Sequence, residues 1–360
     1  MRNIGILTSG GDCQGLNAAI RGIGKALYTK YGNDVAIYGI HDGYRGLIKG
    51  IFQRMGPGDF SGILTLGGTI LGTSRQPYKY ICRAEKNGSH VVEAMKKNYA
   101  ALDLECLVIL GGNGTHKTAN LLSKEGLHII TLPKTIDNDI WGTDITFGFS
   151  SAVEIATHVI DCIHTTAMSH SRVFIVEIMG HKVGWLTLNA GIAGGADVIL
   201  IPEIPYDTDE IVETLRRRNR AGKRFSILAV AEGSISQDES RLNRKEFLEE
   251  RKKMKFPSVS YRLADEIGRM TGQEIRVTVP GHIQRGGTPC PYDRMLATRF
   301  GTAAAELIEA KKYGRMVAMK GGQMVSVPLG EVAGKLKKVP AGCGLITTAR
   351  EIGIGFGCKF

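Results

Sequence analysis

Short apolar runs alternate along the chain with longer amphipathic stretches. The runs are rich in Val, Ile and Leu, as is typical of parallel strands buried on both faces. Glycine-containing turns separate several runs from the following stretch, where apolar residues recur at helical spacing. The pattern predicts strands at residues 4–7, 35–40, 106–110, 129–132, 173–178, 198–201, 227–230 and 275–279. It predicts helices at residues 16–30, 117–123, 207–220, 259–270 and 291–311.

This order of strands and helices predicts an α/β protein with two doubly wound, Rossmann-like domains and mainly parallel sheets. The length of 360 residues is sufficient for two globular domains, each with its own core. Residues 234–255 break the alternation because they are mostly polar and charged. We expect this stretch to form a surface insertion.

Composition excludes several classes of protein. Apolar residues make up 43% of the chain, yet no apolar run approaches the ~18 residues that cross a bilayer. Polar residues and glycines follow the first apolar run too soon for a signal peptide, so we expect a cytoplasmic protein. The seven cysteines include no CxxC pair, which argues against disulfides and zinc. The net charge of +11 suits an acidic ligand, but the basic residues are too dispersed for a nucleic-acid site.

Two glycine clusters each lie between a predicted strand and a predicted helix. The first is Ser-Gly-Gly-Asp at residues 9–12, and the second is Gly-Gly-Asn-Gly-Thr at residues 111–115. Backbone N–H groups at the start of a helix attract anions, and glycine lets a phosphate approach the backbone closely. The first cluster fits neither GxGxxG nor a Walker A loop, and a glycine-rich turn without a ligand remains its alternative.

The segment Pro-Lys-Thr-Ile-Asp-Asn-Asp at residues 133–139 carries the side chains that phosphoryl transfer requires. Asp137 could take a proton from an attacking alcohol, and Asp139 could hold Mg²⁺. Lys134 and Thr135 could stabilise charge on the phosphate oxygens. A turn rich in Asp and Asn is the structural alternative. This segment and both glycine clusters lie at the carboxyl ends of predicted parallel strands, where α/β proteins bind ligands.

A third group follows the last predicted strand, at residues 281–287. His282 and Arg285 are three residues apart there, so both could reach one phosphate monoester. Arg172 and Arg276 add cations at the starts of other strands. A surface ion pair is the alternative for each arginine taken alone.

Together these motifs resemble the bacterial phosphofructokinase family from residue 5 through the C-terminal region. The resemblance rests on residues 7–12, 42–44, 72–75, 111–115, 135–139, 179–180, 231–233 and 281–287, in family order. It implies the phosphofructokinase fold, with a donor-binding domain of residues 1–148 and 285–338. A domain that binds fructose 6-phosphate is expected to comprise residues 149–284 and 339–360.

The resemblance also implies a role for each matching residue. Asp137 is the expected base that removes the C1 hydroxyl proton of fructose 6-phosphate, with Thr135 and Arg75 at the transferring phosphoryl group. Asn113 and Asp139 are expected to organise Mg²⁺. The expected donor site comprises Gly11, Tyr44, Arg75, Gly112, Asn113, Gly114, Thr115 and Lys134. The expected sugar-phosphate site comprises Thr135, Asp137, Met179, Gly180, His181, Glu232, His282 and Arg285, with Arg172 and Arg276 supplied by a neighbouring subunit of a homodimer or homotetramer.

The chain departs from the family pattern at positions that affect the donor and the metal. Asn113 replaces the usual aspartate, and an amide is a weaker Mg²⁺ ligand than a carboxylate. His181 replaces an arginine with an imidazole, whose charge depends on pH. Gly114 is typical of ATP users because it leaves room for the nucleotide, whereas Lys134 is typical of pyrophosphate users. We expect ATP as the donor, with pyrophosphate as the alternative; the text around residues 164–167 and 184–185 resembles the mixed-donor branch.

Two other classes of function remain as alternatives. A regulatory subunit with weakened catalysis is suggested by Asn113 and His181, although Asp137 and Asp139 are intact. An NAD-dependent oxidoreductase is suggested by the strand–glycine–helix start, although the GxGxxG spacing is missing.

Overall fold

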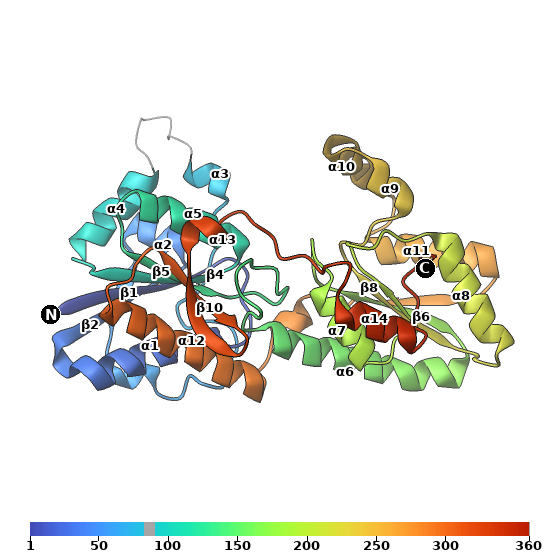
Figure 1. The fold of residues 1–360 in the computed structure, drawn as a ribbon, viewed down its shortest axis with the longest axis horizontal. Helices are drawn as coiled ribbons and strands as arrows, with labels where there is room; N and C mark the ends of the chain where they lie inside the picture. Colours follow the sequence, from blue (N-terminus) through green and yellow to red (C-terminus); the bar gives the residue numbers. More distant parts are fainter. Residues whose placement is uncertain (83–90, 360) are drawn as a thin grey trace. The chain divides into compact units, whose positions relative to one another are not determined.

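The computed structural model describes residues 1–82 and 91–359. The chain divides into two compact units. Unit 1 comprises residues 1–151 and 285–337, and unit 2 comprises residues 152–284 and 338–360. Residues 83–90 of unit 1 and residue 360 of unit 2 lie outside the described part. Each unit has a central sheet with helices on both faces (Figure 1), and the predicted class, α/β with mainly parallel sheets, is confirmed. The binding roles expected of the two domains stay predictions.

The sheet of unit 1 has seven strands in the order β11-β10-β5-β4-β1-β2-β3. The five inner strands run parallel, whereas β3 and β11 pair antiparallel at the two edges. The chain leaves β1 towards β2 on one side and later adds β4 and β5 on the other, which makes a topological switch point between β1 and β4. The strands are β1 (Arg2–Ser9), β2 (Val35–Ile40), β3 (Phe52–Met55), β4 (Cys106–Gly111), β5 (Ile129–Pro133), β10 (Arg315–Lys320) and β11 (Gln323–Pro328).

Helices cover both faces of this sheet (Figure 1). Helices α1 and α12 cross closely because each has a glycine at the contact: a Cβ on Gly22 would lie 2.8 Å from the Thr298 carbonyl oxygen, and one on Gly301 would lie 2.5 Å from that of Ala19. The other face carries α2, α4 and α5 over the core formed by Leu7, Leu107 and their neighbours. The helices are α1 (Leu16–Tyr31), α2 (Tyr44–Lys49), α3 (Tyr78–Ile81), α4 (Val91–Ala101), α5 (Asn113–Lys124), α12 (Pro291–Glu309) and α13 (Leu329–Val332).

Unit 2 has a smaller, entirely parallel sheet in the order β7-β8-β6-β9. Helices α8 and α11 bury apolar side chains against it, among them Ile211, Leu215, Leu263 and Ile267. The strands are β6 (Val173–Ile178), β7 (Val198–Leu200), β8 (Ser226–Ala231) and β9 (Ile275–Thr278). The helices are α6 (Phe149–His170), α7 (Trp185–Ala193), α8 (Thr208–Arg220), α9 (Gln237–Arg241), α10 (Arg244–Lys253), α11 (Val259–Thr271) and α14 (Gly344–Glu351), and the 3₁₀ turn η3 is Gly281–Arg285.

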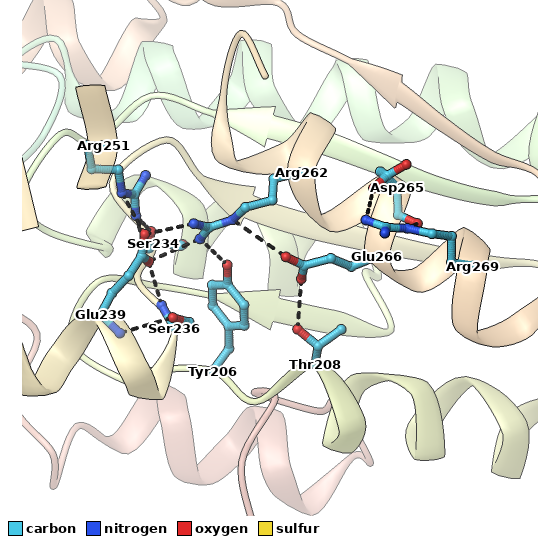
Figure 2. A network of polar contacts seen from close by, with 10 residues as sticks. All are labelled: Tyr206, Thr208, Ser234, Ser236, Glu239, Arg251, Arg262, Asp265, Glu266 and Arg269. Carbon is cyan, nitrogen blue, oxygen red and sulfur yellow. Dashed lines mark hydrogen bonds and ion pairs between the residues drawn. The ribbon is translucent and has the colours of Figure 1, made fainter. Parts of the chain in front are cut away.

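The expected surface insertion at residues 234–255 is helical and only partly on the surface. It contains α9 and α10, and the side chain of Glu239 is only 8% exposed. Figure 2 shows Glu239 between two arginines: its Oε1 lies 2.9 Å from Nε of Arg251 and 2.8 Å from Nη1 of Arg262. Nη2 of Arg262 donates to the Tyr206 hydroxyl. Burial opposes ionisation of Glu239, but the hydrogen bonds and charges of these arginines lower its pKa overall. A buried ion pair therefore anchors the insertion, and the polar composition of residues 234–255 did not predict it.

The start of α5 also differs from the predicted helix. The predicted helix at residues 117–123 begins earlier, at Asn113, so the second glycine cluster forms the end of β4 and the first turn of α5 rather than a loop. Within the described residues, no helix has the length and apolarity needed to cross a bilayer. All seven cysteines are described, and all are free thiols.

Candidate active site

A cleft of about 430 Å³ opens in unit 1 at the carboxyl ends of β1, β4 and β5. The strand register explains why: Ser9 pairs with Gly111, and Gly111 pairs with Pro133, so the three predicted motifs begin side by side. The donor cleft, as we call it, is lined by Ser9, Gly10, Gly11, Tyr44, Arg75, Gln76, Pro77, Gly112, Asn113, Gly114, Thr115, Lys134, Thr135, Asp137, Asp139 and Arg285. Every residue of the predicted donor site and both predicted metal residues are among them.

Two glycines, one beside the donor cleft and one lining it, lie very close to neighbouring side chains. A Cβ on Gly111 would lie 2.3 Å from Cγ2 of Thr115, so the turn from β4 into α5 needs glycine there. A Cβ on Gly11 would lie 3.1 Å from an Arg285 guanidinium nitrogen and 3.3 Å from one of Arg75. Both guanidinium groups therefore reach the same point of the glycine loop, and a ligand phosphate bound there would meet two cations.

The first turn of α5 points its backbone N–H groups into the donor cleft and is held by two buried side chains. The Tyr44 hydroxyl donates a hydrogen bond of 2.9 Å to the Thr115 carbonyl, and Nδ1 of His116 lies 2.8 Å from the Gly112 carbonyl. Burial lowers the pKa of His116 to about 4, so the ring is neutral at pH 7 and Nδ1 is the donor. Sequence reasoning did not single out His116, because a histidine in an amphipathic helix gives no signal of this contact.

Lys134 is buried, and its ammonium donates a hydrogen bond to the Gly11 carbonyl. Burial lowers its pKa from the ordinary value, with the charge of Arg285 acting in the same direction. Lys134 thus ties the end of β5 to the first glycine loop, a contact within the protein that the sequence pattern did not indicate.

The residues that follow β5 form a tightly bonded turn, which we call the transfer loop (residues 134–146). The Asp137 N–H donates to Oγ1 of Thr135 at 3.1 Å, and the Thr146 hydroxyl donates to the Thr135 carbonyl at 2.8 Å. Asn138 has a left-handed backbone with φ of 52°, and its Oδ1 accepts from the Thr146 N–H. The structural alternative of a turn rich in Asp and Asn is therefore correct for Asn138, while Asp137 and Asp139 line the donor cleft.

The predicted sugar-phosphate residues are divided between the units. Arg285 lies in unit 1 in the donor cleft, where Nη1 donates to the Asp12 carbonyl at 3.0 Å. In unit 2, Met179 and Gly180 follow β6, and Glu232 follows β8, so these residues share the carboxyl edge of the sheet. The Gly180 N–H donates to Oε1 of Glu232 at 3.4 Å.

The remaining predicted residues of that edge are His181 and His282, both of which are exposed. His282 belongs to η3, which is attached to the edge because Oε1 of Gln284 accepts from the Met179 N–H at 3.2 Å. The edge therefore presents two imidazoles and a carboxylate.

Arg172 and Arg276 lie at the opposite, amino end of the same sheet. Arg172 precedes β6, and the register pairs Phe174 with Arg276. Both guanidinium groups pair with the Glu274 carboxylate, for Arg172 at 2.8 Å. Since β6 has 6 residues, it separates these arginines from Met179 by roughly 20 Å. Unit 2 of a single chain therefore cannot bring these arginines and the residues of the carboxyl edge to the same sugar phosphate.

Comparison with known proteins agrees with this geometry. The family model described as phosphofructokinase matches residues 3–308. The chain belongs to the phosphofructokinase family. It is 60% identical over 360 residues to an ATP-dependent 6-phosphofructokinase of Spirochaeta thermophila, covering 99% of this chain and 98% of that one. It is 47% identical over 376 residues to an ATP-dependent 6-phosphofructokinase of Propionibacterium freudenreichii, covering 98% and 99%. The family predicted from the sequence is confirmed.

Solved phosphofructokinase structures share the fold. The phosphofructokinase of Pichia pastoris in the T-state matches with a TM-score of 0.77 and 33% identity over 98% of this chain, which spans only 36% of that longer chain. A pyrophosphate-dependent phosphofructokinase from Marinobacter aquaeolei matches with a TM-score of 0.81 over 99% of this chain and 88% of that one. Its identity of 22% shows the common fold alone.

Two residues of the donor cleft fit Mg²⁺ as ligands. Among the described residues, no group of three or more His, Cys, Asp or Glu side chains could hold a metal by itself. Mg²⁺ at phosphate sites commonly takes only one or two carboxylates, with phosphate oxygens and water completing its shell. Asp139 and Asn113 line the donor cleft and offer such oxygens. Burial, and next the charge of Asp137, raise the pKa of Asp139 to about 6.

The raised pKa of Asp139 predicts a pH-dependent demand for Mg²⁺. Below about pH 6 the carboxyl holds a proton that a metal must displace, so the apparent Kd for Mg²⁺ should rise about tenfold between pH 7 and pH 5. Magnesium titrations of the ATP complex at several pH values measure this effect. Asp139→Asn is the matched control, because its amide does not titrate while ATP titrates equally in both proteins. Equal pH dependence in the two proteins would contradict the prediction.

Proposed function

We propose that the protein is an ATP-dependent 6-phosphofructokinase, which transfers the γ-phosphoryl group of ATP to the C1 hydroxyl of fructose 6-phosphate. The observation that carries the proposal is the donor cleft. It combines a carboxylate for the base, cations for the phosphates and the start of α5 in one space at the switch point of a parallel sheet. A glycolytic reaction of this kind belongs to the cytoplasm, where we place the enzyme.

Asp137 is the proposed general base. It would accept the C1 hydroxyl proton as the sugar oxygen attacks the γ-phosphorus. Its backbone N–H is fixed on Thr135, and the transfer loop is closed by Asn138 and Thr146, so the carboxylate is held on a rigid turn. Preorganisation of this kind makes the attack effectively intramolecular.

Charge on the transferring phosphoryl group would be stabilised from several sides. Arg75 and the first turn of α5 face the donor, and Thr135 lies beside Asp137. Asp139 and Asn113 would hold Mg²⁺, which when bound neutralises charge on the phosphate oxygens. Lys134 contributes positive charge while it anchors Gly11.

The space at Gly114 supports ATP as the donor. A Cβ built on Gly114 meets no protein atom within 4 Å, so the position faces open space in the donor cleft and leaves room for a nucleotide. Lys134 was the residue that favoured pyrophosphate. Its ammonium donates to the Gly11 carbonyl, and this structural role is compatible with either donor. Pyrophosphate is therefore the second donor to test.

Fructose 6-phosphate would bind at the carboxyl edge of the unit 2 sheet. Met179, Gly180, His181, Glu232 and His282 lie along that edge and would hold the sugar and its phosphate. Arg172 and Arg276 lie at the amino edge, so we propose that a second copy of the chain supplies them. The active enzyme is then a homo-oligomer, with two or four subunits.

This arrangement predicts complementation between two inactive variants. Asp137→Asn and Arg172→Ala would each damage a different part of the shared site. Co-expressed chains form mixed oligomers in which some sites carry both native residues, so activity should return to about a quarter of the wild-type value for random pairing in a dimer. Assays of the mixed and single-variant oligomers measure it. Activity no higher than that of the better single variant would exclude a shared site.

The proposed function is tested by product analysis on the purified wild-type chain with fructose 6-phosphate, ATP and Mg²⁺. We expect stoichiometric ADP and fructose 1,6-bisphosphate, with phosphate on C1 identified by ³¹P NMR. Absence of turnover with either donor would favour a regulatory subunit with weakened catalysis. Binding of NAD instead of ATP would favour an oxidoreductase.

A further inference from the structure

A three-residue segment after α13, which we call the strap (residues 335–337), touches both predicted metal residues of unit 1. The Lys335 carbonyl accepts a hydrogen bond of 2.5 Å from Nδ2 of Asn113, at the start of α5. Two residues later, the Lys337 N–H donates to the Asp139 carbonyl at 2.9 Å, and Leu336 forms a β-bridge with Ile140. The strap therefore connects the start of α5 with the transfer loop.

The side chain of Lys337 is the strongest of these attachments. Its ammonium donates to Oδ1 of Asn138 at 2.8 Å, to the Thr143 carbonyl at 3.0 Å and to the Asp144 carbonyl at 2.8 Å. An ammonium group carries three donors, and here three oxygens of one loop accept them. Bonds from a charged donor are stronger than neutral ones, so Lys337 holds together two parts of the transfer loop that are five residues apart.

The strap also accounts for the asparagine at position 113. The Asn113 amide nitrogen donates to the Lys335 carbonyl, whereas an ionised aspartate has no donor and would place a carboxylate against a carbonyl oxygen. The Asn113 amide thus donates to the strap through Nδ2, and its Oδ1 remains an acceptor. The departure from the family pattern at this position is thus matched by a contact within the chain.

We propose that Lys337 is a positioning residue for phosphoryl transfer, because it holds the transfer loop in place and so fixes Asp137 and Asp139 relative to the start of α5. This inference rests on the proposed function for its catalytic consequence. Its structural half, that Lys337 orders the transfer loop, does not depend on the reaction. Lys337 does not line the donor cleft, so its effect is transmitted through Asn138 and the backbone.

Lys335 provides a matched control. It lies two residues before Lys337, has the same charge and is exposed, and its contact to Asn113 uses only the backbone carbonyl. We expect Lys337→Met to lower kcat by about 10- to 100-fold, the range typical of lost support around a metal site, with KM for fructose 6-phosphate nearly unchanged. Lys335→Met should leave kcat at the wild-type value. Aminoethylation of Lys337→Cys, which restores an amine of similar length, should recover kcat relative to wild type treated in parallel.

Hydrogen exchange measures the structural half directly. In Lys337→Met the amides of the transfer loop, including that of Thr146, should exchange faster, whereas in Lys335→Met they should not. In the wild-type protein the Lys337 amide itself should exchange slowly because it donates to Asp139, a readout that needs no variant. Equal exchange and equal kcat in the two lysine variants, or fast exchange of the wild-type Lys337 amide, would overturn the proposal. A wild-type chain without phosphofructokinase activity would instead refute the proposed function, and the exchange data would still decide the role of Lys337.

Discussion

Replacing Asp137 with asparagine should lower kcat for fructose 6-phosphate phosphorylation by about 10²- to 10⁴-fold, the contribution typical of a general base. The asparagine amide has nearly the same shape as the Asp137 carboxylate, and the hydrogen bond to Thr135 comes from the backbone N–H of residue 137 rather than from its side chain. The transfer loop should therefore stay folded, and KM for ATP and for fructose 6-phosphate should change little. Steady-state kinetics of the purified variant measure the effect.

The pH dependence of the rate distinguishes loss of the catalytic base in Asp137→Asn from a distortion of the transfer loop. With a carboxylate base, the wild-type rate falls as the pH drops through the pKa of that group, whereas the residual rate of Asp137→Asn should lose this limb. A variant that retains more than about a tenth of the wild-type kcat would assign the proton transfer to another group.

Introducing a carboxylate at position 114 should act on the donor rather than on the sugar. Gly114→Asp can fold without a clash, because no protein atom lies within 4 Å of an added Cβ. The new charge would stand in the donor cleft and repel the triphosphate, and like charges at an interface cost several kcal/mol. We expect kcat/KM for ATP to fall by at least about 100-fold, a cost of about 2.7 kcal/mol.

Gly58→Asp is the control for this substitution. Gly58 is an exposed glycine of unit 1, in the 3₁₀ turn Pro57–Phe60, and a Cβ there also meets no atom within 4 Å. The control should retain the wild-type kcat/KM for ATP. A Gly114→Asp enzyme that still used ATP as well as the control would show that position 114 lies outside the nucleotide path.

Much of the fold and the contents of the donor cleft could be predicted from the sequence, because both depend on short-range patterns. Continuous apolar runs such as 106–110 became buried parallel strands, and polar residues just after β1, β4 and β5 had to meet at one edge. The antiparallel strands β3 and β11 were missed because edge strands such as Phe52–Met55 are largely exposed and carry no continuous apolar run. Strand β10 was also missed, although residues 316–319 are apolar and buried.

The contacts that organise the site could not be predicted in the same way, because they join distant parts of the chain. Lys337 lies 199 positions from Asn138. A lysine in a polar segment is ordinarily expected to be solvated, so the sequence gives no sign of this contact. Glu239 was expected on the surface because its neighbours are charged, yet Arg251 and Arg262 make its burial possible. Arg285 was assigned to the sugar phosphate from its spacing to His282; it lines the donor cleft, and its binding role stays a prediction.

The most direct measurement is kcat/KM for ATP and for pyrophosphate, side by side, on the wild-type chain with fructose 6-phosphate and Mg²⁺. A base at residue 137 facing a nucleotide-sized space at residue 114 predicts formation of fructose 1,6-bisphosphate with a higher kcat/KM for ATP. A higher kcat/KM for pyrophosphate, or no product with either donor, would contradict it.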